Sequence, residues 1–284
     1  MIAVTGATGH LGILAIKELL DRGTKASEIV AVVRNKGKAQ DLVSKGIEVR
    51  EADYGNAESL IKAFQGIEKL LFISGSEVGA RVPQHTNIMS AAKKANIKFI
   101  AYTSILNIEN STLLLAKEHQ FTEKLIRDSG IPHAFLRNGW YIENYSERLE
   151  SALQTGAIVG SAGNGKLSAA TRADYAAAAA IVITSKTNGN SVYELGGDAF
   201  TMSEFAAVVS KVSGKKIEYK NMPPGEYTKL LMSFGLPAVF AEALADSDAG
   251  ISRGELYTDR DDLKKLIGRP LTTLEAAIKK SLQQ

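Results

Sequence analysis

The sequence Met1-Ile2-Ala3-Val4-Thr5-Gly6-Ala7-Thr8-Gly9-His10-Leu11-Gly12 opens the chain, and a stretch of helical character at 13–20 follows it. An apolar run of strand length leads into three glycines spaced three apart, after which apolar residues recur at helical period. Glycine permits positive φ and close backbone approach, while the N–H groups and the positive dipole end of a new helix attract a pyrophosphate. The stretch therefore predicts a strand, a tight turn and a helix that together cradle a dinucleotide.

The glycine spacing is not specific by itself, because Thr8 stands where ordinary NAD dehydrogenases have a middle glycine. The surrounding sequence adds the missing context. The turn follows a strand, opens a helix and leads to a second apolar stretch at 29–33 that ends before Arg34. A turn with a purely structural role is the alternative, but the complete order of elements favours a dinucleotide site.

The composition is that of a globular protein without a nucleic-acid footprint. Of 284 residues, 45% are hydrophobic and 23% are charged, and 34 basic against 31 acidic residues give a net charge of +3. No basic block stands out, so we expect no nucleic-acid partner. The sequence has no cysteine, which excludes disulfides and thiolate chemistry and favours a cytoplasmic location. We expect no membrane span, because the longest apolar run, 176–183, is too short, and no targeting segment, because the first strand begins at residue 2.

Strands and helices alternate through the first half of the chain. Strands are predicted at 29–33, 47–52, 69–74, 99–104 and 133–137, and helices at 38–44, 57–64, 84–95 and 116–129. Such alternation implies right-handed crossovers and a doubly wound parallel sheet of the Rossmann type. Ligands of these sheets bind beyond the carboxyl ends of the strands, so residues just after each strand are candidates for chemistry.

Beyond residue 140 the alternation stops. We predict a loop at 160–165, an alanine-rich helix at 174–184, a strand at 192–195, and capping boxes at Thr201–Glu204 and Thr272–Glu275. The expected organisation is a dinucleotide-binding domain at 1–140, a mixed segment at 141–199 that completes the sheet and the cleft, and a small helical substrate lobe at 200–284.

The residue after the second strand indicates which dinucleotide is bound. NAD sites usually place Asp or Glu about 20 residues past the glycines, whereas Arg at that place suits a 2′-phosphate. The chain has Arg34 there, with Lys36 and Lys38 nearby and Asp41 as the nearest acidic residue. A guanidinium stacked on adenine, or simply a surface arginine, is the alternative. The pattern favours NADP(H).

Five segments together resemble the NmrA-like atypical short-chain dehydrogenases. They are 5–12, 33–35, 52–54, 136–144 and 170–175, of which the last two are the most restrictive. The resemblance runs nearly from end to end and implies an NADPH-binding quinone reductase. The cofactor-binding residues that it implies are Gly6, Ala7, Thr8, Gly9, His10, Leu11, Gly12, Arg34, Ser74, Gly75, Ser76, Glu77, Gly139, Trp140, Tyr141, Ile142, Glu143, Asn144, Ala170, Thr171 and Arg172.

The sequence does not identify the catalytic residues. Typical short-chain dehydrogenases use a Tyr-x-x-x-Lys pair as the acid. Here Lys117 lies in the right region, but Leu113 occupies the place of the tyrosine. A quinone tolerates this loss, because hydride addition gives a weakly basic hydroquinone anion that can take its proton from water. A ketone would need an oriented acid. Lys117 and Ser104, the latter at the end of its strand, remain weak candidates.

Aromatic residues and histidines complete the candidates. Trp140, Tyr141 and Tyr145 can stack on a flat acceptor or belong to the core, and Asn144 joins them as a predicted substrate-binding residue. The four histidines lie far apart and lack metal-ligand spacing, so we assign no metal. We expect His119 and Glu123, one helical turn apart, to be an exposed pair.

The sequence thus predicts an NADPH-dependent reductase of a small-molecule quinone. The alternative is a non-catalytic NADP redox sensor of the NmrA-like type, which would usually carry an extra interaction segment that this chain does not show. The oligomeric state stays open, with a homodimer as one alternative, and so does the physiological quinone.

Overall fold

The computed structural model describes residues 1–186 and 189–283. The chain divides into two compact units that interleave in sequence. Unit 1 comprises Met1–Ser104, Glu118–Arg137 and Tyr175–Tyr193, and unit 2 comprises Ile105–Lys117, Asn138–Asp174 and Glu194–Gln284. The sequence-based division after residues 140 and 199 stays a prediction.

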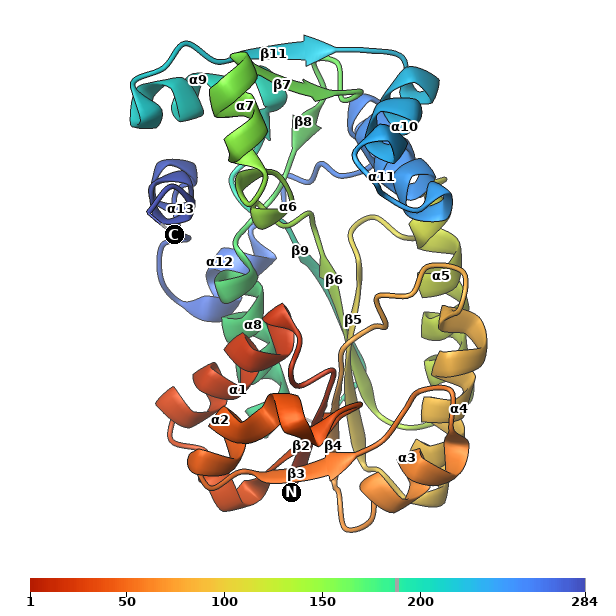
Figure 1. Ribbon diagram of the computed structural model, residues 1–284. Helices are drawn as coiled ribbons and strands as arrows, with labels where there is room; N and C mark the ends of the chain where they lie inside the picture. Colours follow the sequence, from red (N-terminus) through yellow and green to blue (C-terminus); the bar gives the residue numbers. More distant parts are fainter. Residues whose placement is uncertain (187–188, 284) are drawn as a thin grey trace. The chain divides into compact units, whose positions relative to one another are not determined.

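A sheet of seven strands organises unit 1 (Figure 1). In spatial order these are β3 (Glu48–Glu51), β2 (Ile29–Val33), β1 (Ile2–Thr5), β4 (Lys69–Phe72), β5 (Phe99–Ile105), β6 (His133–Asn138) and β9 (Ser191–Leu195). The pairings that join β3, β2, β1, β4 and β5 are parallel. The chain reverses its direction of travel across the sheet between β1 and β4, which is the switch point where such folds bind ligands. The predicted doubly wound parallel sheet is confirmed.

Helices cover both faces of this sheet (Figure 1). One face carries α1 (His10–Asp21), α2 (Gln40–Ser44) and α8 (Arg172–Thr184), and the other carries α3 (Ala57–Ala63), α4 (Arg81–Lys94) and α5 (Leu114–Asp128). Short 3-10 helices, η1 (Ala26–Glu28) and η2 (Lys36–Ala39), flank β2. Fully buried Leu60, Phe72, Ile88, Ile126 and Phe135 belong to the core on the α3–α4–α5 face. Of the residues expected on the apolar face of α1, Gly12, Ala15, Ile16 and Leu19 are buried, and Leu20 is half-buried.

Unit 2 is mainly helical and contains two small sheets. Its helices are α6 (Glu143–Ser146), α7 (Leu149–Thr155), α9 (Met202–Ser213), α10 (Pro224–Ser233), α11 (Ala238–Ser252), α12 (Asp262–Ile267) and α13 (Leu274–Ser281). Strand β7 (Ala157–Gly160) pairs in parallel with β11 (Glu218–Asn221), and β8 (Lys166–Leu167) pairs antiparallel with β10 (Phe200–Thr201). The sequence did not predict these four strands, and Gly160, expected to begin a loop, ends β7. Each strand is short, and it is formed by pairing with a segment distant in the chain.

The two predicted capping boxes have different outcomes. Thr201 accepts a hydrogen bond from the backbone N–H of Glu204, whose side chain accepts in turn from the N–H of Thr201, so the first box is confirmed. The second is wrong by one residue, because Thr273 caps α13 by accepting from the N–H of Ala276. The carboxylate of Glu275 pairs with Lys211 and Lys279 instead of closing a box.

Candidate functional site

The glycine turn between β1 and α1 is held by its own backbone. The N–H of Gly9 donates to the carbonyl of Gly6 at 2.9 Å, and the N–H of Ala7 donates to the carbonyl of Val32 at 3.3 Å. Gly6 has φ of +61°, which favours glycine. A Cβ on Gly12 would lie 2.3 Å from the carbonyl oxygen of Gly6 and 2.8 Å from the Cα of Ala7. Gly12 therefore allows α1 to pack tightly against the turn.

Gly9 has a different environment from Gly12. It is exposed, it is the N-cap residue of α1, and among the described residues a Cβ placed on it would meet one atom within 4 Å, the Gly6 oxygen at 3.1 Å. No described side chain caps this helix end. The first N–H groups of α1 also lack carbonyl partners within the helix. An open, uncapped helix N-terminus beside a glycine fits a pyrophosphate.

The side chains of the turn point in different directions. Ala7 and Leu11 are buried, so these residues can offer a ligand their backbone atoms only, whereas His10 is exposed and Thr8 is half-buried. Tyr54, in the turn that follows β3, lies beside the glycine turn. Its hydroxyl is 3.6 Å from a Cβ placed on Gly6 and donates to the Ile73 carbonyl at 3.1 Å. The sequence does not indicate Tyr54 as a site residue, although Tyr54 belongs to the 52–54 segment of the family resemblance.

Arg34 lies at the carboxyl end of β2, as predicted, and its side chain is exposed. Its guanidinium donates to Oε1 of Glu77, in the loop after β4. The structure thus brings together Arg34 and Glu77, two of the predicted cofactor-binding residues. Of the others in that loop, Ser74 donates its backbone N–H to the hydroxyl of Thr103 at 3.0 Å, and Ser76 is exposed.

A buried polar network lies under this loop. The N–H of Gly75 donates to Nε2 of His85 at 3.1 Å, and Nε of Arg81 donates to the carbonyl of Gly75 at 2.6 Å. Burial lowers the pKa of His85 to about 3, and the Arg81 guanidinium adds to the shift. His85 is therefore a neutral acceptor for the Gly75 amide. No sequence signal indicates this role, because His85 and Arg81 are on α4 and become neighbours of Gly75 only in the folded chain.

The expected exposed pair of His119 and Glu123 is wrong. Both side chains are buried on α5. Nδ1 of His119 lies 2.7 Å from the hydroxyl of Tyr102, and burial lowers the pKa of His119 well below its ordinary value. Glu123 accepts hydrogen bonds from the guanidinium of Arg137 at 3.0 and 2.9 Å. Each residue has its own tertiary partner, which a one-turn spacing on a helix cannot reveal.

The candidates for catalysis have contrasting environments. Lys117 is exposed on α5. Leu113 is fully buried in the core of unit 2 and packs against Gly250 of α11. A Cβ added to Gly250 would lie 2.2 Å from a methyl carbon of Leu113. Ser104, near the carboxyl end of β5, is 5% exposed, and its hydroxyl oxygen has no hydrogen-bond partner among the described residues. A buried hydroxyl at this end of a strand is available to a ligand.

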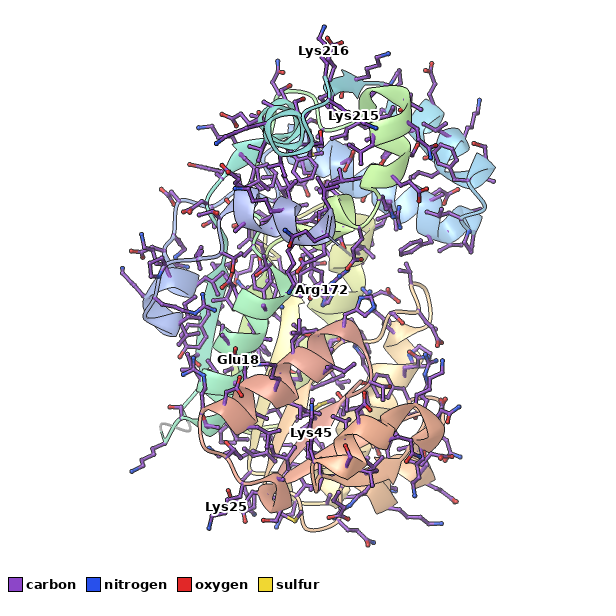
Figure 2. The ribbon with its side chains drawn as sticks, turned by 60° about the vertical axis from the view of Figure 1, so that its left-hand side comes forward. Glu18, Lys25, Lys45, Arg172, Lys215 and Lys216 are labelled. Atoms are coloured by element: carbon purple, nitrogen blue, oxygen red, sulfur yellow. The ribbon has the colours of Figure 1, made fainter. Side chains whose placement is uncertain are left out.

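Two predicted segments of unit 2 are joined through their backbones. Tyr141 and Ala170 form a parallel bridge, and the N–H of Ile142 donates to the carbonyl of Ala170 at 3.1 Å. Arg172, the first residue of α8, is labelled in Figure 2. Its guanidinium lies over the ring of Tyr141, 5.4 Å from the ring centroid. Its backbone N–H donates to Glu143 at 2.9 Å. Burial raises the pKa of Glu143.

The other residues of these segments are held locally. Arg172 forms an ion pair with Glu147 and a hydrogen bond to Oδ1 of Asn144 at 3.4 Å. The hydroxyl of Thr171 donates to the buried carboxylate of Asp174 at 2.8 Å. Trp140 is 8% exposed and belongs to the core of unit 2, and the N–H of Gly139 donates to the carbonyl of Leu195 at 2.8 Å. The structure therefore brings 139–144 and 170–172 into one set of contacts.

Tyr145 has a partner that the sequence did not indicate. Its hydroxyl donates to Oδ1 of Asp248 at 2.8 Å, and its ring packs against Phe205 with 5.8 Å between centroids. Oδ2 of Asp248 accepts from the N–H of Ser161 at 2.9 Å. Burial raises the pKa of Asp248 to about 6, which these two hydrogen bonds partly offset. Asp248 fixes Tyr145 and the residue after β7 to α11.

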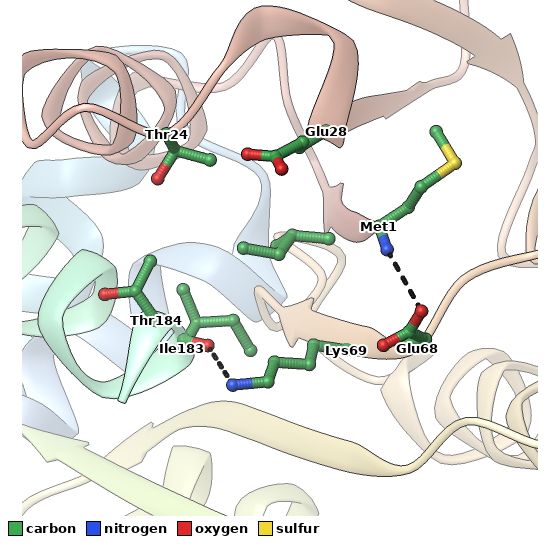
Figure 3. Close-up of a pocket in the computed structure, with 8 residues that line it drawn as sticks. Met1, Thr24, Glu28, Glu68, Lys69, Ile183 and Thr184 are labelled. Atoms are coloured by element: carbon green, nitrogen blue, oxygen red, sulfur yellow. Dashed lines mark hydrogen bonds and ion pairs between the residues drawn. The ribbon is translucent and has the colours of Figure 1, made fainter. Parts of the chain in front are cut away.

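A small pocket of about 260 Å³ lies elsewhere in unit 1 (Figure 3). Met1, Glu28, Lys69 and Ile183 are among its lining residues, and Lys69 donates to the carbonyls of Ile183 and Ser185 at the end of α8. The pocket is at the amino ends of β1 and β4. Because doubly wound sheets bind ligands beyond the carboxyl ends, this pocket is not the candidate site.

Metal-binding clusters and membrane-spanning helices are absent from the described residues. Three or more His, Asp or Glu side chains do not come together there in a group that could hold a metal ion. Within those residues, every helix is too short or too polar to cross a membrane.

The parallel sheet with its switch point, the open glycine turn and Arg34 define a dinucleotide-binding α/β protein. The model of the NmrA-like family matches residues 1–270, and the chain belongs to that family. It is 53% identical over 279 residues to quinone oxidoreductase 2 of Escherichia coli strain K12, which covers 98% of this chain and 97% of that protein.

Solved structures agree with this assignment. The E. coli NADPH-dependent quinone oxidoreductase in complex with NADPH superposes with a TM-score of 0.96 at 52% identity, over 99% of this chain and 100% of that one. The Citrobacter sp. triphenylmethane reductase in complex with NADP(H) gives a TM-score of 0.94 at 43% identity, over 99% of this chain and 100% of that one. These are proteins that the chain is similar to over nearly its full length.

Proposed function

We propose that this protein is an NADPH-dependent quinone reductase. The observation that carries the proposal is Leu113, a fully buried apolar residue at the place where short-chain dehydrogenases of the ordinary type have the tyrosine acid before Lys117. An acceptor that needs no oriented acid suits this site, and a quinone is such an acceptor. Membership of the NmrA-like family and the similarity to a relative named quinone oxidoreductase 2 support the same conclusion.

NADPH, when bound, supplies a hydride. In our proposal the backbone N–H groups at the start of α1 bind its pyrophosphate beside Gly9, and Arg34 binds its 2′-phosphate. We propose that the cofactor is also bound by the rest of the turn and by three other segments that the family resemblance implies. The turn spans 6–12, and the other segments are 74–77, 139–144 and 170–172.

The protein's role toward the quinone is to position it. We propose that Tyr141, Asn144, Tyr145 and Trp140 bind the flat ring and that the free hydroxyl of Ser104 binds an oxygen of the substrate. The hydroquinone anion formed by hydride addition is weakly basic, so water can supply its proton. The rate enhancement then comes from holding the reactants in a productive geometry. In well-oriented reactions this can lower the activation barrier by up to about 7–11 kcal/mol.

A steady-state assay tests the proposal. NADPH oxidation should be rapid with a panel of benzoquinones and naphthoquinones and slow with unactivated ketones and aldehydes under the same conditions. Rapid reduction of a simple ketone would return the protein to the ordinary carbonyl reductases. Tight NADPH binding without turnover of any quinone would identify it as a redox sensor instead.

We further propose a cytoplasmic location, supported by a sequence of 284 residues without cysteine. A homodimer remains our working proposal for the oligomeric state. Cell fractionation and light scattering of the purified protein test these two points.

A further inference from the structure

An ion pair spans the predicted binding place of the 2′-phosphate. The guanidinium of Arg34, at the end of β2, donates to Oε1 of Glu77 at 2.5 Å. The amide nitrogen of Gln84 donates to Oε2 of the same carboxylate at 2.7 Å. Arg34 and Glu77 are 62% and 48% exposed, so both side chains are accessible to a ligand. Arg34, the proposed partner of the 2′-phosphate, is therefore already paired with the carboxylate of Glu77.

The loop that carries Glu77 is fixed by buried contacts. Gly75 bonds to His85 and Arg81 through its N–H and its carbonyl, as described above. Further along the loop, Oε1 of Glu118 accepts from the N–H groups of Gly79 and Arg81 at 3.1 and 3.2 Å. The backbone on both sides of Glu77 is therefore anchored, so the ion pair opens by rotation of the Glu77 or the Arg34 side chain.

We propose that Glu77 is a specificity-determining residue for the nicotinamide cofactor. Its carboxylate competes with the 2′-phosphate of NADPH for Arg34, and it accepts a hydrogen bond from the ribose 2′-hydroxyl of NADH. The inference rests on the proposed cofactor site. It adds that the opposite charges of Arg34 and Glu77 together decide which cofactor is preferred.

The two cofactors differ in the group that meets this pair. A phosphate monoester carries about −1.5 to −2 charges near pH 7, so it is attracted by Arg34 and repelled by Glu77. A ribose hydroxyl is neutral and can donate to a carboxylate, which is the role of the acidic residue in NAD-binding sites. Because exposed ion pairs are weak, Glu77 should alter the preference several-fold and not abolish binding of either cofactor.

The test is a measurement of cofactor binding by titration calorimetry in the absence of quinone, at fixed ionic strength. Glu77→Gln keeps the size of the side chain and can still bond to Gln84, but it removes the charge. We expect the Kd for NADPH to fall about two- to fivefold and the Kd for NADH to rise about two- to fivefold. Glu58→Gln, which removes an equal charge from an exposed residue in the first turn of α3, is the matched control and should change neither Kd.

Three outcomes would overturn the inference. Unchanged Kd values in Glu77→Gln would show that the carboxylate does not compete, and equal weakening of both cofactors would show a role in holding the loop alone. The third is equal tightening of NADPH by Glu77→Gln in the wild-type and Arg34→Ala backgrounds. The carboxylate would then act by direct repulsion of the phosphate and not by competing for Arg34, as the proposal requires. Because binding is measured without turnover, these results are separate from a failure of quinone reduction.

Discussion

The glycine turn of unit 1 and the Asp248 contacts of unit 2 differ in the chemical groups that form them. The turn offers backbone N–H groups at Gly9 and the start of α1, which do not titrate. Asp248 instead buries a carboxylate with a hydroxyl and a backbone N–H as partners. Cofactor affinity should therefore depend on shape at the turn, whereas the contribution of Asp248 to stability should depend on pH.

The largest effect is expected from the turn. Gly9→Val should reduce the binding of NADPH and NADH below detection by calorimetry, because a branched side chain fills the space beside the helix N-terminus where the pyrophosphate would lie. Circular dichroism should show a folded protein, since the nearest atom to the new Cβ is the Gly6 oxygen at 3.1 Å.

Gly12→Ala sharpens this contrast between two glycines of one turn. The added Cβ would lie 2.3 Å from the carbonyl oxygen of Gly6, so we expect a lower midpoint of urea unfolding. This is a structural defect and not a selective loss of cofactor binding. Retained cofactor affinity in Gly9→Val would show that the turn is only structural.

The next effect concerns Asp248. Its pKa rises from 3.8 to about 6 on folding, so its favourable contribution to stability is fully present below about pH 3.8 and is lost as the pH rises through about 6. The shift corresponds to roughly 3 kcal/mol. Asp248→Asn cannot ionise, so its free energy of unfolding relative to wild type should increase by about 2–3 kcal/mol between pH 4 and pH 7.

Urea unfolding at several pH values measures this difference. Glu242→Gln, an exposed change on the same helix, is the control. A difference between Asp248→Asn and wild type that stays constant with pH would mean that Asp248 remains ionised across the range.

Arg34→Ala tests the charged edge of the cofactor site. Loss of a charge-assisted contact of about 1.5–3 kcal/mol should weaken NADPH about ten- to a hundredfold while hardly affecting NADH. Calorimetry with both cofactors gives the two values. Equal losses for NADPH and NADH would contradict the assignment of the 2′-phosphate to Arg34.

The smallest effect is expected at Lys117. Its side chain is exposed and Leu113 provides no hydroxyl for it to act on, so Lys117→Ala should leave quinone reduction within a few-fold of wild type. General acid catalysis typically contributes about 10²- to 10⁴-fold. A decrease of that size in kcat would reveal a proton relay through this lysine.

The parts of the protein that were predicted well are encoded by neighbouring residues. The turn at 6–12, the apolar face of α1 and the capping box of Thr201 and Glu204 each depend on residue types within a few positions. The predicted box of Thr272 and Glu275 fails because the N–H of Thr272 donates to Asp174 and the carboxylate of Glu275 pairs with Lys211 of α9. Local preference fails where a tertiary partner competes for the same side chain.

The sequence by itself determined the doubly wound sheet, the glycine turn at its first crossover and Arg34 at the end of β2, because periodicity and turn chemistry act locally. Only the tertiary structure decided the partners of the buried polar groups. Asp248 meets Tyr145, and Glu123 meets Arg137, across intervals of 103 and 14 residues. The same holds for Glu77 and Arg34, 43 residues apart. A side chain chooses such partners by burial and geometry, and these exist only once the chain has folded.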